Sequence, residues 1–186
     1  MTRQLGQTEV KRLNRSWRQA TQARVCLLLD SVSQPFNVGS IVRTAAAFGV
    51  EHIWLCGDSA DPGHPSARKT ALGTGRLLTF EQAGGVAAAV NAVRAQGLRL
   101  VAVELADGAI PLHEAAVGGD VCLALGNEDR GCSPALLAAA DQTAYIPQIG
   151  RVGSLNVAAA AAIVLAEARR REWGGNQGDD RAGRLP

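Results

Sequence analysis

Short, continuous runs of apolar residues recur along this chain, and they restrict its fold more than any other feature. Val25–Leu29 and Val121–Leu125 are apolar at every position, which is typical of strands buried on both faces of a sheet. Further strands are predicted at His52–Cys56, Leu77–Phe80, Leu98–Val103 and Thr143–Ile146. Helices are predicted between them at Val38–Phe48, Val86–Gln96, Pro134–Ala140 with Ser133 as N-cap, and Leu155–Trp173. This alternation predicts an α/β fold with a mostly parallel sheet and helices on both faces.

The two ends of the chain differ in composition from this middle part, which we expect to form the main domain at 25–173. A helix is predicted from Thr8, its expected N-cap, to about Gln22. Residues 1–24 hold six basic residues and one acidic residue, a net charge of +5 within a chain of net charge +2. We expect a basic helical extension that contacts an anionic partner such as RNA through Lys11, Arg12, Arg15 and Arg18, and a solvated amphipathic helix is the alternative. The tail at 174–186, rich in Gly, Asp and Arg, is expected to be disordered.

Several classes of protein are disfavoured by composition. The four cysteines form no C-x-x-C pair and are expected to be buried free thiols in a reducing cytosol, and the three scattered histidines argue against zinc or another metal site. No apolar stretch is long enough to cross a membrane, and the polar N-terminus is unlike a signal peptide, so we expect a cytoplasmic protein. The absence of G-x-G-x-x-G and of a P-loop disfavours a dinucleotide enzyme or an NTPase.

Three polar stretches lie where an apolar run gives way to a turn or to a helix start. They are Asn37–Arg43, Gly126–Gly131 and Ile146–Val157, which contain N-V-G-S-I-V-R, G-N-E-D-R-G and I-P-Q-I-G-R-V-G-S-L-N-V. Ligands of parallel sheets bind beyond the carboxyl ends of the strands, so the three stretches predict one site. Taken singly, each has a structural explanation as a helix cap, a surface ion pair or a turn.

The order, spacing and residues of these stretches resemble the SpoU/TrmH family of RNA 2'-O-ribose methyltransferases, in the SPOUT superfamily, from about Val25 to Glu172. The resemblance implies S-adenosylmethionine as cofactor, RNA as substrate and a homodimer with its active site close to the subunit interface. It also implies a deep C-terminal trefoil knot, which no local pattern predicts because knots are exceptions to the usual rules of chain topology.

The resemblance also assigns roles to individual residues. The catalytic set is Arg43, Asn37, Glu128, Ser154 and Asn156, with Asn37 orienting Arg43. The cofactor set is Val103, Gly126, Asn127, Gly131, Ile146 and Leu155. Arg68 and Lys69 precede T-A-L-G, a segment that lies near the RNA-facing side in the family, although a helix turn with two solvated cations is an equal alternative.

The chemistry of ribose methylation suits an arginine. A guanidinium is a planar fork that can hold a phosphate and place the neighbouring ribose, but it stays protonated and makes a poor base. The sequence leaves open whether Arg43, a phosphate oxygen or Glu128 takes the proton. Two alternatives also stay open: an RNA-binding knot protein without catalysis, and methylation of a base nitrogen.

The short extension favours a compact RNA substrate. About 24 residues precede the first buried strand, too few for a separate recognition domain, so recognition is assigned to the basic extension, the Arg169-Arg170-Arg171 cluster and the catalytic face. Such features contact phosphates and RNA shape rather than single bases. We therefore expect tRNA rather than rRNA.

Overall fold

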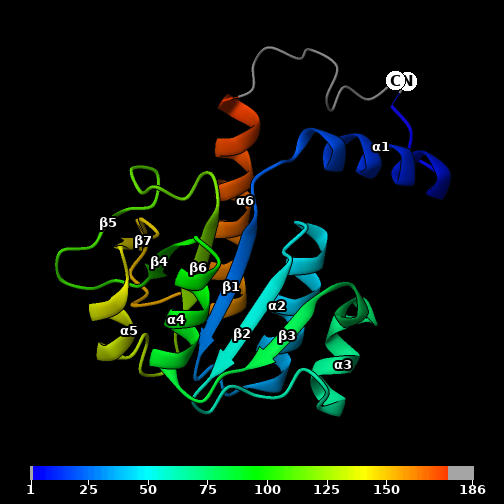
Figure 1. The fold of residues 1–186 in the computed structure, drawn as a ribbon. Coiled ribbons are helices and arrows are strands. Elements are labelled where there is room, and N and C mark those ends of the chain that lie inside the picture. The colour runs from blue at the N-terminus through cyan, green and yellow to red at the C-terminus, as the bar shows by residue number, and fades with distance from the viewer. Residues whose placement is uncertain (1, 176–186) are drawn as a thin grey trace.

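Seven parallel strands form one sheet in the computed structural model, which describes residues 2–175 (Figure 1). The strand order is β3-β2-β1-β6-β4-β7-β5, and every neighbouring pair is parallel. The bounds are β1 Val25–Asp30, β2 His52–Cys56, β3 Thr79–Gln82, β4 Arg99–Val103, β5 Ile110–Pro111, β6 Val121–Leu125 and β7 Gln142–Tyr145. The predicted α/β fold is thus confirmed.

Helices cover both faces of the sheet, as the buried strands require. They are α1 Gln7–Ala20, α2 Pro35–Ala47, α3 Pro65–Ala71, α4 Val86–Ala95, α5 Pro134–Ala139 and α6 Val157–Gly175, with a short 3₁₀ helix, η1, at Thr74–Leu77. Successive side chains of a strand point to opposite faces. Leu27 and Leu29 therefore pack with α2 and α6, whereas Cys26 and Leu28 pack with α4 and α5. Each face has its own apolar core.

The parallel arrangement gathers the ends of strands that are distant in sequence. β1 lies between β2 and β6, and β6 lies between β1 and β4. Val25 pairs with Val121 in the register of the central strands. Consequently, the segments that follow β1, β6, β4 and β7 all emerge at one edge of the sheet, where the polar stretches begin.

Several boundaries differ from the sequence predictions. α1 begins after Gly6, whose backbone N–H donates to the Glu9 carboxylate at 2.8 Å, so Thr8 is not the N-cap. The strand predicted at Leu77–Phe80 is shifted to Thr79–Gln82 because η1 occupies the preceding residues. The short elements α3 and β5 were not predicted as such. α6 begins at Val157, two residues later than predicted, and it ends at Gly175. The first two residues of the tail predicted to be disordered, Gly174 and Gly175, are therefore helical. The rest of that tail, 176–186, lies outside the described residues.

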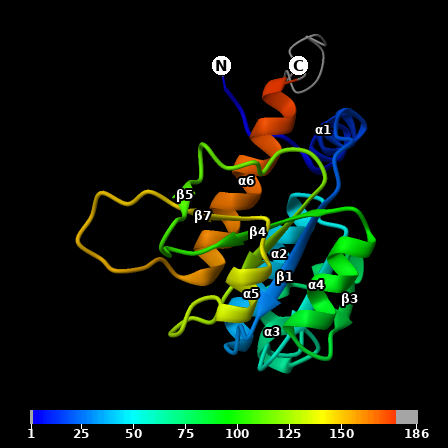
Figure 2. The same ribbon diagram turned by 60° about the vertical axis from the view of Figure 1, so that its left-hand side comes forward.

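α1 is attached to the body mainly at its C-terminal end. The rings of Trp17 and Trp173 lie 4.6 Å apart between centroids, and Trp173 Nε1 donates to Thr21 Oγ1 at 3.0 Å. The Glu172 carboxylate accepts the backbone N–H groups of Gln22 and Ala23. No residue of α1 is buried, and the helix stands away from the sheet beside the end of α6 (Figures 1 and 2).

Other sequence predictions concern composition and topology. All four cysteines are free and buried, as predicted. Within residues 2–175, no helix has the length and apolar character needed to cross a bilayer. The described part of the chain also contains no cluster of three His, Cys, Asp or Glu side chains placed to hold a metal ion. The trefoil knot and the proposed division at residues 24 and 173 stay predictions.

Candidate active site

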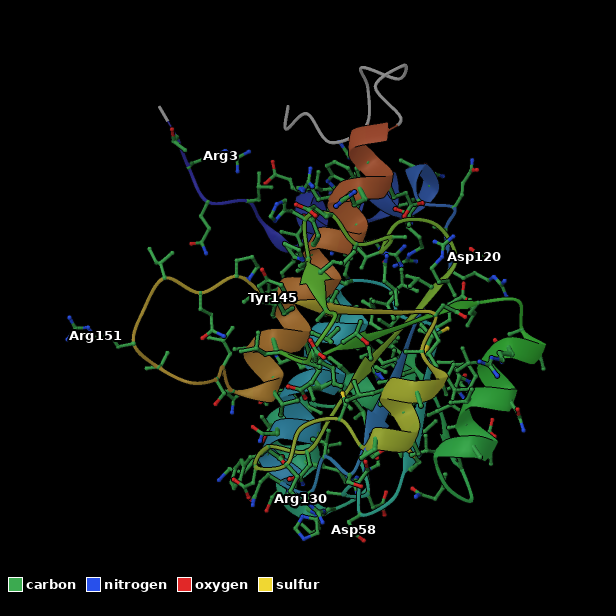
Figure 3. All side chains as sticks on the ribbon, turned by 90° about the vertical axis from the view of Figure 1, so that its left-hand side faces the viewer. Arg3, Asp58, Asp120, Arg130, Tyr145 and Arg151 are labelled. Atoms are coloured by element: carbon green, nitrogen blue, oxygen red, sulfur yellow. The ribbon has the colours of Figure 1, made fainter. Side chains whose placement is uncertain are left out.

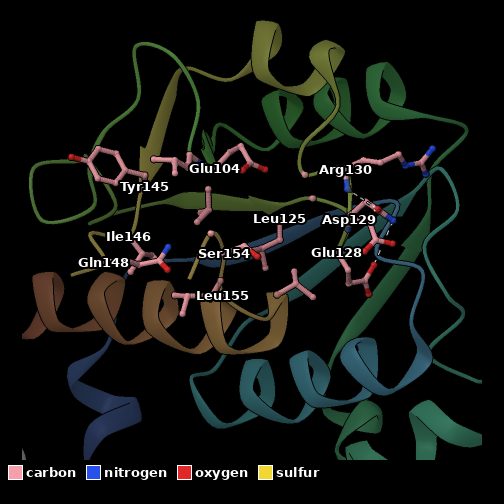
Figure 4. Close-up of a pocket in the computed structure, with 18 residues that line it drawn as sticks. Glu104, Leu125, Glu128, Asp129, Arg130, Tyr145, Ile146, Gln148, Ser154 and Leu155 are labelled. Atoms are coloured by element: carbon pink, nitrogen blue, oxygen red, sulfur yellow. Dashed lines mark hydrogen bonds between the residues drawn. The ribbon is translucent and has the colours of Figure 1, made fainter. Parts of the chain in front are cut away.

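A pocket of about 300 Å³ lies at the carboxyl ends of β4, β6 and β7, against the start of α6 (Figure 4). All six residues predicted for cofactor binding line it: Val103, Gly126, Asn127, Gly131, Ile146 and Leu155. Two of the predicted catalytic residues, Glu128 and Ser154, also line it. The structure therefore brings the second and third polar stretches together around one cavity.

The loop after β6 owes its shape to glycine and asparagine. Asn127 and Gly131 exchange backbone hydrogen bonds of 3.0 and 2.9 Å, and the Asn127 side-chain oxygen accepts the N–H groups of Asp129 and Arg130. A Cβ atom added to Gly126 would lie 2.1 Å from the Cys132 nitrogen, and Gly131 has a φ of +70°. Neither position accommodates a larger residue without rearrangement, so the glycines fix this wall of the pocket.

Glu128 ties this loop to the start of α2. Its carboxylate accepts the backbone N–H groups of Ser33 and Gln34 at 3.1 Å each, the Ser33 hydroxyl at 3.3 Å and Asn37 Nδ2 at 2.9 Å. Burial alone would raise the pKa of the Glu128 carboxyl, but the hydrogen bonds, above all the one from Asn37, outweigh it and lower the pKa. Glu128 is thus held as an anion whose oxygens are already occupied.

Asn37 continues this connection to α6. Its side-chain oxygen accepts Asn156 Nδ2 at 3.0 Å, so Glu128, Asn37 and Asn156 form one chain of hydrogen bonds. The Asn156 oxygen accepts the N–H groups of Ala158 and Ala159 and so caps α6. This series of hydrogen bonds joins three segments that are far apart in sequence, and it fixes α2 relative to the pocket.

The Glu128 connection predicts a measurable loss of stability in Glu128→Gln. An amide can no longer accept from all four donors, so we expect a loss of about 1–2 kcal/mol at pH 7. Because the folded-state pKa is depressed, the carboxylate contributes this stability above the unfolded pKa, and the contribution is lost as pH falls through the folded pKa. Urea unfolding of both proteins at pH 7 and in steps below pH 4.5 measures it. A difference independent of pH would contradict the anionic role.

Arg43 stands apart from this network. It is exposed on α2, six residues after Asn37, and within residues 2–175 it makes no side-chain hydrogen bond or ion pair. Asn37 was expected to orient Arg43, but its amide contacts Glu128 and Asn156 instead. Asn37 and Arg43 therefore share α2, but within residues 2–175 their side chains form no hydrogen bond with each other.

A second, more open cleft lies between α3, η1 and α2, with a volume of about 1080 Å³. The exposed cations Arg68, Lys69 and Arg76 line it, together with an apolar wall that includes Phe80. The exposed Leu72 adopts an unusual φ of +50° at the end of α3. Arg76 is missing from the residues predicted from sequence, because only the turn after α3 brings it beside Arg68.

The basic residues of the segment 1–24 are partly exposed on α1 and partly paired with acidic side chains. Lys11, Arg12, Arg15 and Arg18 are all exposed on α1. Arg24, by contrast, pairs with Asp120 at 2.6 Å.

The expected Arg169-Arg170-Arg171 cluster needs correction. Arg169 is only 3% exposed, and its guanidinium donates to the backbone oxygens of Phe48, Gly49 and Ala23. Arg170 and Arg171 both pair with Glu167. Arg169 therefore holds the fold together and is not available to RNA.

Two polar pocket residues, Glu104 and Tyr145, lie outside the three polar stretches, and Gln148, inside the third stretch, was assigned no role from the sequence. Glu104 directly follows β4, and a charged residue immediately after a buried strand was the signal that was available. Tyr145 is the last residue of β7, and Gln148 lies in the third polar stretch, the segment that leads from β7 to α6. This segment continues as a long loop that stands away from the body, with Arg151 near its tip (Figures 2 and 3).

Comparison with known proteins adds to this geometry. The model of the SpoU rRNA Methylase family matches residues 24–166. The chain is 36% identical over 149 residues to the 23S rRNA (guanosine-2'-O-)-methyltransferase RlmB of Acinetobacter baylyi, a match that covers 80% of this chain and 60% of that protein. It is 33% identical to the tRNA (guanosine(18)-2'-O)-methyltransferase of Escherichia coli, with 80% and 64% covered.

A solved structure is similar over the same region. The AdoMet-bound rRNA methyltransferase from Sinorhizobium meliloti has a TM-score of 0.75 and 32% identity, covering 83% of this chain and 59% of that one. The chain spans 59–64% of the length of three curated relatives that it matches. The similarity thus covers most of this chain and less than two thirds of those relatives.

Proposed function

Because the chain belongs to the SpoU rRNA methylase family, we propose that it transfers a methyl group from S-adenosylmethionine to a ribose 2'-hydroxyl of RNA in the cytoplasm. The observation that supports this most directly is the pocket at the carboxyl ends of β4, β6 and β7, where all six predicted cofactor residues meet. The chain of hydrogen bonds from Glu128 through Asn37 to Asn156 joins this pocket to α2, which carries Arg43.

The pocket residues fit the proposed cofactor. A volume of about 300 Å³ lies within the range of small-molecule sites. Leu125, Leu155 and Val103 offer apolar surface for a purine ring, and the glycines of the loop after β6 bring backbone groups to the wall. S-adenosylmethionine supplies a methyl group bound to a positively charged sulfur, which makes that methyl group electrophilic.

The protein residues then have separable tasks in the proposed reaction. Arg43 holds a phosphate of the RNA through its fork of N–H groups and donates a hydrogen bond to the ribose 2'-oxygen, so that oxygen faces the pocket. Glu128 is a poor candidate for the base because its oxygens already accept hydrogen bonds from Ser33, Gln34 and Asn37 and its pKa is lowered. The 2'-hydroxyl proton is therefore assigned to an oxygen of the phosphate that Arg43 holds, since the guanidinium itself stays protonated. We assign Glu128, Asn37 and Asn156 to positioning α2, and Ser154, which lines the pocket, to the reaction site.

Mass spectrometry of nucleosides tests the reaction. RNA from cells is incubated with the protein and labelled S-adenosylmethionine, without added metal, and is then digested to nucleosides. We expect label in 2'-O-methylnucleosides alone. Label in methylated bases would support the alternative reaction on a base nitrogen. Cofactor binding by calorimetry without any methyl transfer to RNA would support the alternative of a non-catalytic RNA-binding protein.

We propose tRNA rather than rRNA as the substrate. The exposed cations of α1 and of the α3–η1 cleft suit the closely spaced phosphates of a folded RNA. The relatives named above include enzymes named for tRNA and for rRNA, so they do not decide the question. Equal concentrations of purified tRNA and rRNA with labelled cofactor decide it, and label in rRNA alone would overturn the choice.

The basic face of α1 gives a further prediction. Replacing Lys11, Arg12, Arg15 and Arg18 by glutamine is expected to weaken RNA binding and to reduce the slope of log Kd against log salt by as much as about four, one for each phosphate that is no longer neutralised. Glutamine keeps the helix propensity, so α1 stays folded. The matched control is Arg3→Gln, since Arg3 already pairs with Glu9. An unchanged salt slope would indicate a solvated structural helix.

We also propose a homodimer and retain the predicted trefoil knot. Ile149, Val152 and Ile163 are large apolar residues with exposed fractions of 107%, 67% and 40%, and a groove beside α6 is lined in part by Leu112, Ile146 and Ile163. Such surface favours a second copy as the partner. Light scattering after size exclusion tests it: a monomer at micromolar concentration would contradict the dimer.

A further inference from the structure

Glu104 is a carboxylate that lines the pocket. It directly follows β4, is half-buried, and makes no ion pair with any other residue of the described range 2–175. Its oxygens accept the backbone N–H groups of Cys132 at 2.8 Å and of Leu105 at 3.0 Å. A carboxylate has about four acceptor positions, so two stay available to a ligand.

The neighbouring loop leaves space for this carboxylate. A Cβ atom added to Gly131 would lie 2.3 Å from Glu104 Oε2. Glycine at this position therefore serves the Glu104 carboxylate as well as the turn. The side chain lies between the end of β4 and the Gly126–Gly131 loop, on the wall of the cavity (Figure 4).

The other charged groups of the pocket are engaged elsewhere. Glu128 accepts four hydrogen bonds from the start of α2 and its preceding loop. The Arg130 guanidinium lies 3.7 Å from the carboxylate of Asp58, a residue that does not line the cavity. Asp129 is exposed. With three carboxylates and one guanidinium, the lining as a whole is negative, and Glu104 is the half-buried anion with free acceptor positions.

We propose that Glu104 recognises the positive charge of S-adenosylmethionine and so makes the pocket prefer the methyl donor over its demethylated product. This inference rests on the proposed function of the same pocket. The donor carries a sulfonium and an ammonium group against one carboxylate, a net charge of +1, whereas loss of the methyl group leaves a neutral thioether and a neutral molecule overall. A fixed anion in a half-buried site attracts the first more than the second.

The test compares two ligands on one conservative variant. Glu104→Gln keeps the size of the side chain and one oxygen to accept the Cys132 N–H, but it removes the charge. Calorimetry without RNA measures Kd for S-adenosylmethionine and for S-adenosylhomocysteine. We expect the Kd for S-adenosylmethionine to rise on the order of 10-fold and the Kd for S-adenosylhomocysteine to change less than about 2-fold. The matched control, Asp107→Asn, is expected to change both by less than about 2-fold because Asp107 is exposed and does not line the pocket.

The outcomes separate this inference from the function beneath it. If Glu104→Gln raises the Kd of both ligands equally, Glu104 binds an uncharged part of the ligand, such as a ribose hydroxyl, and the inference is wrong. If the variant keeps its thermal stability and its affinity for both ligands, Glu104 only contacts the neighbouring loop, and the inference is also wrong. If the unmodified protein binds neither ligand, the proposed function itself fails.

Discussion

Replacing Arg43 by alanine is expected to lower the rate of ribose methylation on the order of 10²-fold or more, because positioning and proton transfer at the acceptor each depend on this side chain in the proposed mechanism. Binding of S-adenosylmethionine is expected to be nearly unchanged, since Arg43 does not line the pocket. The unfolding free energy is expected to change little, because the side chain is exposed. Single-turnover methylation, calorimetry and urea unfolding measure the three quantities.

Two matched variants sharpen the Arg43 experiment. Arg43→Lys keeps a positive charge but loses the planar fork, so it is expected to recover only part of the activity. Arg94→Ala is the control: Arg94 lies on α4, on the opposite face of the sheet, where it donates to the Ala139 carbonyl oxygen. Near-normal turnover by Arg43→Ala would contradict its assigned role while leaving the cofactor site intact.

The largest expected loss of stability is that of Arg169→Ala, about 3–5 kcal/mol. The buried guanidinium satisfies the carbonyl oxygens of Phe48 and Gly49, at the end of α2, and that of Ala23, before β1. It also pairs with Glu172 at 3.0 Å. Its removal leaves these carbonyl oxygens without a donor, and it leaves the nearly buried Glu172 carboxylate without its cation.

Urea unfolding measures this loss, and the neighbouring arginine is the control. Arg170→Ala removes an exposed guanidinium that pairs with Glu167, so it is expected to change the unfolding free energy by less than about 1 kcal/mol. Equal effects of the two substitutions would show that the burial of Arg169 does not determine its contribution. Arg169→Met, with a similar apolar stem but no donors, separates packing from hydrogen bonding.

The strands buried on both faces were predicted well because their sequences are apolar throughout. β6 begins and ends at the predicted residues, and β1 extends one residue further, to Asp30, whose carboxylate is buried and accepts the Ser133 N–H. β3 was misplaced by two residues because it is an exposed edge strand, whose residues carry little of the apolar pattern. The two-residue β5 has no sequence pattern of its own.

The site was predictable in its parts and not in its connections. Glycines and polar residues after buried strands marked the pocket, since the ends of parallel strands meet at one edge. The bond between Asn37 and Asn156 spans 119 residues, and no local pattern encodes it. Likewise, three consecutive arginines at the end of α6 look alike in sequence, and only the packing of α1, α2 and α6 distinguishes the buried Arg169 from its neighbours.

The order of strands in the sheet has a consequence for biosynthesis. β1 is synthesised well before its partner β6, which follows 96 residues later, as the pairing of Val25 with Val121 shows. Because synthesis adds about 5–20 residues per second, the edge of β1 that pairs with β6 stays without its partner strand for seconds, and the apolar side chains of β1 stay partly uncovered. The nascent chain can pair β1 with β2, and β2 with β3, during that time, but the pocket can form only after β6, β7 and α6 have emerged. Slow translation or a chaperone acting before residue 121 is therefore expected to affect the yield of folded protein more than either would after it.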